Sequence, residues 1–361
     1  MAHIQLKNIT KTFGRHVALK NLSLDIADGE FFVLLGETGA GKTTTLRLVA
    51  GLEKPTEGEV FIDGVDVGDW GAAERDVALV LQQYSLYPRY TVRENLEFPL
   101  KSKLRRVPDA EIKERVARAA KTLRIEHLLE RKTDRLSGGE MQRVSIGRAI
   151  VRKPRVFLMD EPLSALDAKL RESLRTELKN IQMNLGQTFL FVTHDQIEAM
   201  SMGDKVGLLN HGNLVQVGTP HEIYSNPRDT FVASFVGSPP MNLIDGRLVA
   251  GRAIFQPKSF ELPYEGQTRA GTLTDERPLT FGIRPEDVAI DAAGPVEARV
   301  HDVENHGVEK IITLRVGETI LRATAPAQTN VTIDDAVRFA WNPSKVSLFD
   351  QKSGVSLRHA G

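Results

Sequence analysis

The sequence predicts an α/β domain followed by a smaller all-β domain. Short, fully apolar runs alternate with stretches of helical periodicity in the first two thirds of the chain. From about residue 230 onward, the pattern changes to short alternating segments broken by Gly and Pro, as in a small barrel or sandwich. Ser238-Pro239-Pro240 reads as a linker, and we expect the domains to span 1–235 and 236–361.

The composition argues against several classes of protein. Lys plus Arg and Asp plus Glu both number 47 in 361 residues, whereas a dedicated nucleic-acid binder should carry a basic excess. The chain has no cysteine, so a disulfide framework, a thiolate zinc site and a cysteine nucleophile are excluded. Residues 1–7 lack the apolar core of a signal peptide, and every apolar run is too short to span a bilayer. We therefore expect a soluble chain that reaches a membrane only through partners.

The most informative stretch is 36–43, which reads G-x-x-x-x-G-K-T. The apolar run 31–35 precedes it, and a helical pattern that ends at Gly51 follows it. This strand, glycine loop and helix form the context of a phosphate-binding P-loop, because the loop N–H groups and the helix N-terminus both attract an anion. Lys42 can then reach the β- and γ-phosphates, and the Thr43 hydroxyl can join a Mg²⁺ shell. The candidate nucleotide-binding residues are Gly36, Glu37, Thr38, Gly39, Ala40, Gly41, Lys42, Thr43 and Thr44. The alternative is a glycine-rich turn that binds nothing.

Polar side chains follow three further apolar runs. Gln82 follows 77–81, the pair Asp160-Glu161 follows 156–159, and His194 follows 189–192. Ligands of open α/β sheets bind where parallel strands end, so Asp160 is expected to hold Mg²⁺ and Glu161 to activate or orient water. Gln82 is expected to touch Mg²⁺ or water. Taken singly, these residues could instead be a loop amide, a turn-capping acidic pair and a satisfied polar histidine.

A second anion site is predicted at Ser137-Gly138-Gly139-Glu140. Ser137 and Glu140 have the spacing of a capping box, which predicts a helix start. The two glycines leave backbone N–H groups bare at that start, where an anion can bind. Because one chain then carries two phosphate-binding helix starts, we expect the two kinds of site to meet across a dimer.

Other segments are assigned more coarsely. Helices are expected to begin near Pro108 and Asp195, and another to end at Gly186. In the all-β part, strands are expected around 246–255, 281–290, 298–304, 308–316 and 319–324. Phe13 is either a core or turn aromatic or a platform on which adenine stacks.

Together these motifs resemble the ATP-binding subunits of ABC transporters. In that comparison 36–43 is the Walker A loop, Gln82 the Q-loop residue and 136–140 the signature, while 156–160 is Walker B and is followed by Glu161. The D-loop is 164–167, the H-loop residue is His194, and Phe13 fits the aromatic A-loop position. Segments 82–88, 166–171, 231–239 and 282–287 resemble, more narrowly, the maltose-type carbohydrate importer ATPases. The resemblance implies a cassette with a mixed sheet core and a helical subdomain near 88–152, followed by a regulatory OB-like (TOBE) domain.

The resemblance also implies an activity and a site. Lys42, Gln82, Glu161 and His194 would be catalytic, with Glu161 as general base and His194 bonded to the γ-phosphate. Thr43, Gln82 and Asp160 would manage Mg²⁺. In a head-to-tail dimer, the nucleotide held by one subunit would be completed by the other subunit. The completing residues would be Ser137, Gly138, Gly139, Glu140 and Asp167.

Partners follow from the same resemblance. The dimer partner would be a second copy or a paralogue, two transmembrane permease subunits would dock near 82–88, and a periplasmic or extracellular solute-binding protein would act indirectly. No nucleic-acid partner is expected. The chain would lie peripherally at the cytoplasmic face of the bacterial inner membrane and energise uptake of a carbohydrate or polyol.

Two departures and three alternatives accompany this interpretation. Glu37-Thr38 stands where proline-serine is common, and Glu140 stands where glutamine is common.

Polyamine, iron or anion importer ATPases also carry C-terminal β domains. A non-transport ABC ATPase should carry a second cassette, a long coiled coil or a basic surface. A P-loop kinase or GTPase would not need 136–140 or His194.

Overall fold

The computed structural model describes residues 2–102, 107–249, 252–255, 260–263 and 278–358. The chain divides into two compact units, Met1–Pro220 and His221–Gly361, which are described separately. This division precedes the expected domain boundary at 235. The reason is that the buried Arg284 donates hydrogen bonds to the carbonyls of Tyr224, Ala233 and Val236, which holds the segment before residue 236 within the second unit.

The first unit is built on two sheets in its described part. One has the order β10-β9-β3-β8-β7-β6, and its strands from β9 to β6 run parallel. Its bounds are β3 Phe31–Gly36, β6 Val77–Val80, β7 Val156–Asp160, β8 Thr188–Thr193, β9 Lys205–Asn210 and β10 Asn213–Gly218. The strands β3, β7 and β8 are buried throughout, which is why their sequences are apolar runs and do not alternate.

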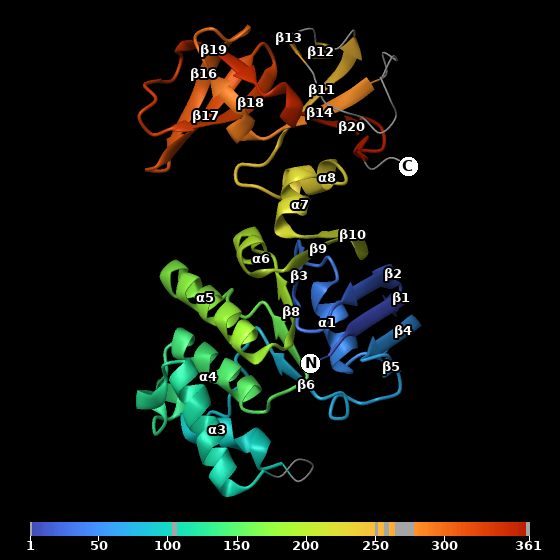
Figure 1. The fold of residues 1–361 in the computed structure, drawn as a ribbon, viewed down its shortest axis with the longest axis vertical. Coiled ribbons are helices and arrows are strands. Elements are labelled where there is room, and N and C mark those ends of the chain that lie inside the picture. Colours follow the sequence, from blue (N-terminus) through green and yellow to red (C-terminus); the bar gives the residue numbers. More distant parts are fainter. Residues whose placement is uncertain (1, 103–106, 250–251, 256–259, 264–277, 359–361) are drawn as a thin grey trace. The chain divides into compact units, whose positions relative to one another are not determined.

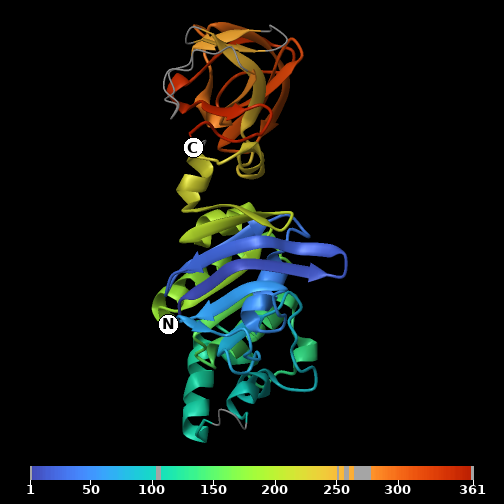
Figure 2. The same ribbon diagram turned by 90° about the vertical axis from the view of Figure 1, so that its right-hand side faces the viewer.

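The second sheet of this unit is antiparallel, with the order β2-β1-β4-β5 (Figure 2). Its bounds are β1 Ile4–Phe13, β2 His16–Ile26, β4 Glu57–Ile62 and β5 Val65–Asp66. Helix α1 (Lys42–Ala50) shares one apolar core with strands of both sheets. The predicted mixed α/β fold is therefore confirmed.

Besides α1, the helices in the described part of this unit are α2 Val92–Glu97, α3 Asp109–Thr122, α4 Gly138–Ile150, α5 Ala168–Leu185 and α6 Gln196–Met202, with the short 3₁₀ helices η1 Phe98–Leu100, η3 Glu126–Leu128 and η4 Thr133–Arg135. Helices α3, α4 and α6 begin at the predicted signals Pro108, Ser137 and Asp195. Figure 1 shows α1 and α6 on opposite sides of the large sheet. Helix α5 ends at Gly186, which adopts a left-handed conformation with φ of 63°, as predicted for a glycine stop. None of the described helices combines the length and apolarity needed to cross a lipid bilayer.

The described part of the second unit is mainly β-structure, as predicted. After α7 (Pro220–Ser225, beginning at the unit boundary) and α8 (Thr230–Phe235) come two sheets, β13-β12-β11-β14-β20 and β15-β19-β16-β17-β18. Phe255, Phe281, Phe339 and Trp341 lie in their common core. The strand bounds are β11 Asn242–Val249, β12 Arg252–Phe255, β13 Glu261–Pro263, β14 Pro278–Ile283, β15 Val288–Ile290, β16 Val296–Asn305, β17 Glu309–Val316, β18 Thr319–Pro326, β19 Ala336–Trp341 and β20 Ser347–Asp350.

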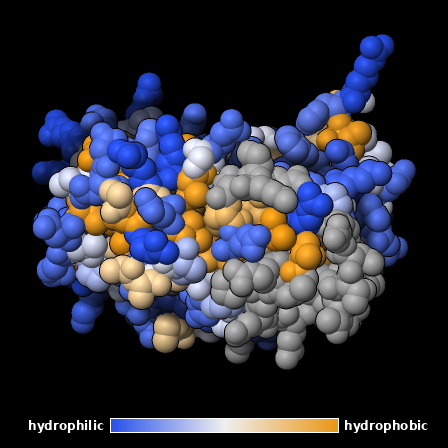
Figure 3. Space-filling view, turned by 90° about the horizontal axis from the view of Figure 1, so that it is seen from above, coloured by the Kyte–Doolittle hydropathy of each residue, from blue (hydrophilic) through white to orange (hydrophobic). Residues whose placement is uncertain are grey.

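Two expected strands of this unit are each two strands in the structure. The segment 246–255 contains parts of β11 and β12, and 281–290 contains part of β14, the 3₁₀ helix η5 (Pro285–Asp287) and β15. Pro285 explains the second break, because proline lacks the N–H that a continuous ladder requires. Figure 3 shows the molecule from above, and hydrophobic and hydrophilic side chains are intermixed on that face.

Candidate functional site

The loop between β3 and α1 requires glycine at two positions. A Cβ on Gly36 would lie 2.3 Å from the Leu209 carbonyl oxygen, so only glycine fits against β9. Gly41 has φ of 108°, and a Cβ there would lie 2.7 Å from the carbonyl oxygen of Ala18. Gly41 is also the N-cap of α1 and offers no side-chain bond, so the first N–H groups of the helix remain available to an anion.

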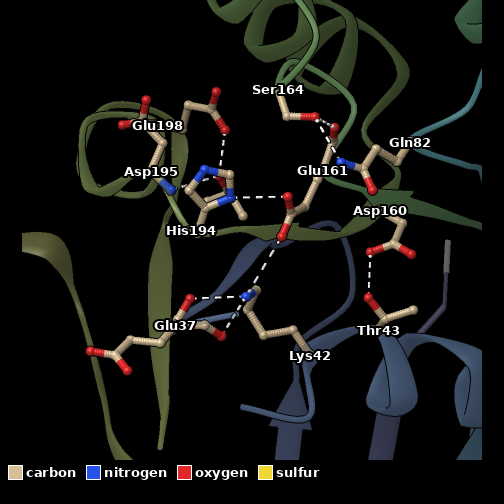
Figure 4. A network of polar contacts seen from close by, with 12 residues as sticks. Glu37, Lys42, Thr43, Gln82, Asp160, Glu161, Ser164, His194, Asp195 and Glu198 are labelled. Carbon is tan, nitrogen blue, oxygen red and sulfur yellow. Dashed lines mark hydrogen bonds and ion pairs between the residues drawn. The ribbon is translucent and has the colours of Figure 1, made fainter. Parts of the chain in front are cut away.

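Lys42 is buried at the start of α1 and has three oxygen neighbours. Its Nζ donates to the carbonyls of Gly36 and Glu37, at 2.9 Å each, and lies 3.6 Å from Oε1 of Glu161 (Figure 4). Burial lowers the pKa of Lys42, and the Glu161 carboxylate opposes that shift. The ammonium group is thus held by carbonyl oxygens of the same loop that is expected to bind the phosphates.

Thr43 and Asp160 are joined directly. The Thr43 hydroxyl donates to Oδ1 of Asp160 at 3.0 Å, which links α1 to the end of β7. Burial raises the pKa of Asp160, and the Thr43 hydrogen bond opposes that shift. Gln82 lies in the same close-up and donates from its Nε2 to Oγ of Ser164 at 3.4 Å (Figure 4). A hydroxyl, a carboxylate and an amide oxygen are the hard ligands that Mg²⁺ accepts.

Glu161 lies at the centre of the cluster. It adopts a left-handed backbone with φ of 45°, which costs a non-glycine residue about 1–2 kcal/mol. Its N–H donates to the Val192 carbonyl at 2.9 Å, and its own carbonyl accepts from the Ser164 hydroxyl at 2.9 Å. These bonds fix the turn, so that one carboxylate oxygen faces Lys42 while the other lies 2.9 Å from Nδ1 of His194.

The turn after β8 positions His194. Asp195 caps α6 by accepting from the N–H groups of Ile197 and Glu198. The Thr193 hydroxyl donates to the buried Glu198 carboxylate at 2.6 Å, and burial raises the pKa of Glu198. The His194 side chain is half exposed and so remains accessible.

The segment 137–140 forms the capping box that the sequence predicts. Glu140 N–H donates to Oγ of Ser137, and Oε2 of Glu140 accepts from the Ser137 N–H at 2.8 Å. The glycines also have a packing role within the chain. A Cβ on Gly139 would lie 2.0 Å from Cδ2 of Leu170, and one on Gly138 would lie 3.1 Å from the Tyr84 hydroxyl. Ser137 and Glu140 bond to each other, and Glu140 also pairs with Arg131. These contacts do not reach the cluster around Glu161 that Figure 4 draws.

Two predicted residues lie elsewhere in the first unit. Asp167 caps α5 by accepting from the Leu170 N–H at 3.0 Å. Phe13 ends β1 and is 44 % exposed, with the Lys11 ammonium 4.7 Å from its ring centroid. An exposed ring beside a cation leaves a face on which a base can stack.

Ser164 has a role that the sequence interpretation missed. It contacts both Gln82 and the Glu161 backbone, and so connects the ends of β6 and β7. Its position three residues after Glu161, in a turn, was the available signal.

Comparison with known proteins places the chain in a family. Family models match the chain as "ABC transporter" over 19–164, "MalK OB fold domain" over 237–288 and "TOBE domain" over 281–349. The chain is 44% identical over 375 residues to the trehalose/maltose import ATP-binding protein MalK of Thermococcus litoralis, covering 99% of this chain and 100% of that protein. The chain belongs to the ABC transporter ATP-binding family.

Other relatives support the assignment of this chain to the ABC transporter ATP-binding family. The sn-glycerol-3-phosphate import ATP-binding protein UgpC of Brucella abortus biovar 1 is 46% identical, covering 97% of each chain. The xylose/arabinose import ATP-binding protein XacK of Haloferax volcanii is 45% identical, covering 99% of this chain and 96% of that protein. The relatives are thus ATP-binding subunits of sugar, pentose and glycerol phosphate importers.

Solved structures support the fold of the cassette. The dimeric structure of MJ0796, a bacterial ABC transporter cassette, matches with a TM-score of 0.56 and 37% identity, covering 60% of this chain and 98% of that one. Its post-hydrolysis state, bound to ADP and Pi, matches with a TM-score of 0.55 and 36% identity over the same shares. The predicted family, fold class and ATPase activity are therefore confirmed.

Proposed function

We propose that this ABC ATPase energises the import of a carbohydrate or polyol through separate transmembrane subunits. Its domains would be the nucleotide-binding domain 1–235, with the helical subdomain near 88–152, and the regulatory domain 236–361. Relatives named for trehalose/maltose, xylose/arabinose and glycerol 3-phosphate support this solute class. The observation that carries the catalytic part is the Glu161 carboxylate, held between Lys42 and His194.

The nucleotide would bind along residues 36–44, with its adenine on Phe13. The uncapped N–H groups of α1 and the Lys42 ammonium would hold the phosphates. Thr43, Gln82 and Asp160 would hold Mg²⁺, which when bound neutralises phosphate charge. Thr43 and Asp160 already lie within hydrogen-bond distance, and one carboxylate with few protein ligands is typical of Mg²⁺ beside a nucleotide.

Hydrolysis would begin with an exchange of partners around Glu161. A γ-phosphate oxygen would attract Lys42 and His194, the two side chains that now face the Glu161 carboxylate. Glu161 would then be free to accept a proton from the attacking water, while the water oxygen bonds to phosphorus and the bond to the leaving ADP oxygen breaks. Lys42 and His194 would stabilise the negative charge on the transferring group.

A second subunit would complete the site, in a head-to-tail dimer of two copies or of paralogues. Ser137, Gly138 and Gly139 would reach the γ-phosphate from that subunit, and Asp167 would lie at the interface. The dimeric neighbouring cassette supports this arrangement. The permease subunits would dock near 82–88, beside the exposed aromatic cluster of Tyr87, Tyr90 and Phe98, at the cytoplasmic face of the bacterial inner membrane.

The experiment is transport by the whole importer. The chain is co-purified with its membrane subunits, reconstituted in vesicles, and assayed for ATP-dependent uptake of labelled sugars and polyols against polyamines, ferric iron and inorganic anions. ATP-dependent uptake of a sugar or polyol alone is expected. Uptake of a polyamine, iron or an anion in its place would overturn the solute class. ATP hydrolysis by the reconstituted importer with no ATP-dependent uptake of any of these solutes would overturn the transport role.

A further inference from the structure

Glu140 brings a negative charge to a helix start that is expected to meet ATP. Its Oε2 accepts from the Ser137 N–H at 2.8 Å and lies 2.9 Å from the Ser137 hydroxyl. The backbone hydrogen bond from Ser137 is the largest cause that lowers the pKa of Glu140, so the side chain is ionised at neutral pH. The glutamine that is common at this position would be neutral.

This charge opposes anion binding in two ways. A helix N-terminus carries the equivalent of about half a positive charge, and a full negative charge in the first turn outweighs it. The Ser137 hydroxyl also donates to this carboxylate at 2.9 Å, and while it does so it cannot donate to a phosphate. A signature with an unopposed Glu140 would therefore be a poor site for a phosphate.

Arg131 lies where it can oppose this charge. Its guanidinium is 3.7 Å from Oε1, the Glu140 oxygen that Ser137 does not use. The backbone at Arg131 is fixed, because its N–H donates to the Leu128 carbonyl at 2.8 Å and its carbonyl accepts from the Val92 N–H at 2.9 Å. His127 also acts on Glu140, but as a smaller cause than Arg131.

We propose that Arg131 is a positioning residue that neutralises Glu140 and so keeps the signature helix able to accept the ATP γ-phosphate of a second subunit. The inference rests on the proposed function, in which the signature of one subunit completes the site of the other. Arg131 acts through Glu140, so its importance must vanish when Glu140 loses its charge.

A double-mutant cycle tests this coupling. ATP hydrolysis by the full chain is measured against ATP concentration for wild type, Arg131→Gln, Glu140→Gln and the double variant. Arg131→Gln should raise KM by about threefold to fivefold, the range of an exposed ion pair. In the Glu140→Gln background, the same change should alter KM by less than about 1.5-fold, and added salt should shrink the single-variant effect.

Two further variants keep the test decisive. Arg118→Gln removes an equal charge from an exposed pair with Glu114 in the same region and should leave KM unchanged. Arg131→Lys keeps the positive charge and should retain a near-normal KM. This variant is the one to measure if Arg131→Gln fails to fold. An equal KM effect of Arg131→Gln in both backgrounds, or a normal KM for Arg131→Gln alone, would overturn the inference. Absence of ATP hydrolysis in the wild-type chain would overturn the proposed function instead.

Discussion

Nδ1 of His194 lies 2.9 Å from Oε2 of Glu161, so the end of β8 is joined to the end of β7 through two side chains. The other Glu161 oxygen faces Lys42 at 3.6 Å. The Glu161 carboxylate thus already contacts both side chains that are expected to bind the γ-phosphate. A phosphate that took these two partners would at once be bound and leave Glu161 free to act as a base.

Glu161→Gln should retain ATP binding and lose turnover. An amide cannot accept the proton of the attacking water, so hydrolysis should fall by about 10²-fold or more. The measurement is steady-state phosphate release together with ATP affinity by titration. Glu172→Gln on the exposed side of α5 is the control and should behave as wild type. Near-normal turnover in Glu161→Gln would remove Glu161 from the role of base.

His194→Ala should lower kcat by about 10-fold to 100-fold with a smaller change in ATP affinity, because Lys42 and the loop still hold the nucleotide. His306→Ala, which removes an exposed histidine whose ring contacts Glu304, is the control. Separate measurements of kcat and KM decide the matter. If the variant weakened ATP binding and left kcat unchanged, His194 would contribute to binding ATP and not to the chemical step.

Asp160→Asn should stabilise the nucleotide-free protein. Burial raises the folded-state pKa of Asp160 above the usual range of an aspartate, so its charge destabilises the fold at neutral pH. The destabilisation is full above the raised pKa and disappears as the pH falls toward the ordinary pKa of an aspartate, about 4, so the gain in Tm should be largest at pH 7 and smallest near pH 4. Thermal melts across this range check it. A gain that grew toward low pH would contradict the assigned shift.

Gly139→Ala tests the contact between α4 and α5. The added Cβ would lie 2.0 Å from Cδ2 of Leu170, and overpacking of this kind costs about 1–3 kcal/mol of unfolding free energy. Leu170→Ala made with it should recover part of that loss, and denaturant titration of the two single variants and the double variant measures it. Strict additivity of the two losses would mean that the side chains do not compete for the same space.

The sequence predicted most of what is regular in this chain. The G-x-x-x-x-G-K-T spacing located the loop before α1, and the Ser137–Glu140 spacing predicted a capping box that the structure has with both bonds. The strand ends carrying Gln82, Glu161 and His194 do meet, because parallel strands β6, β7 and β8 end at one edge of the sheet.

Contacts between distant side chains were beyond such reasoning. The proximity of Lys42 to Glu161 depends on rotamers of two long side chains, and the packing of Gly139 on Leu170 depends on how two helices cross. The division at residue 220, ahead of the expected boundary at 235, depends on Arg284 bonding to carbonyls roughly 50 to 60 residues earlier in the chain. Periodicity reports local structure and the buried face, and it carries no information on such pairs.

Residues 36–44 with Glu161 and His194 are proposed to form half of a site, which the signature of another subunit completes. The most direct test is ATP turnover per chain, measured as the protein is diluted at saturating ATP. Specific activity should fall steeply as the chain dilutes into monomers. Specific activity that stayed constant down to fully dispersed monomers would contradict it.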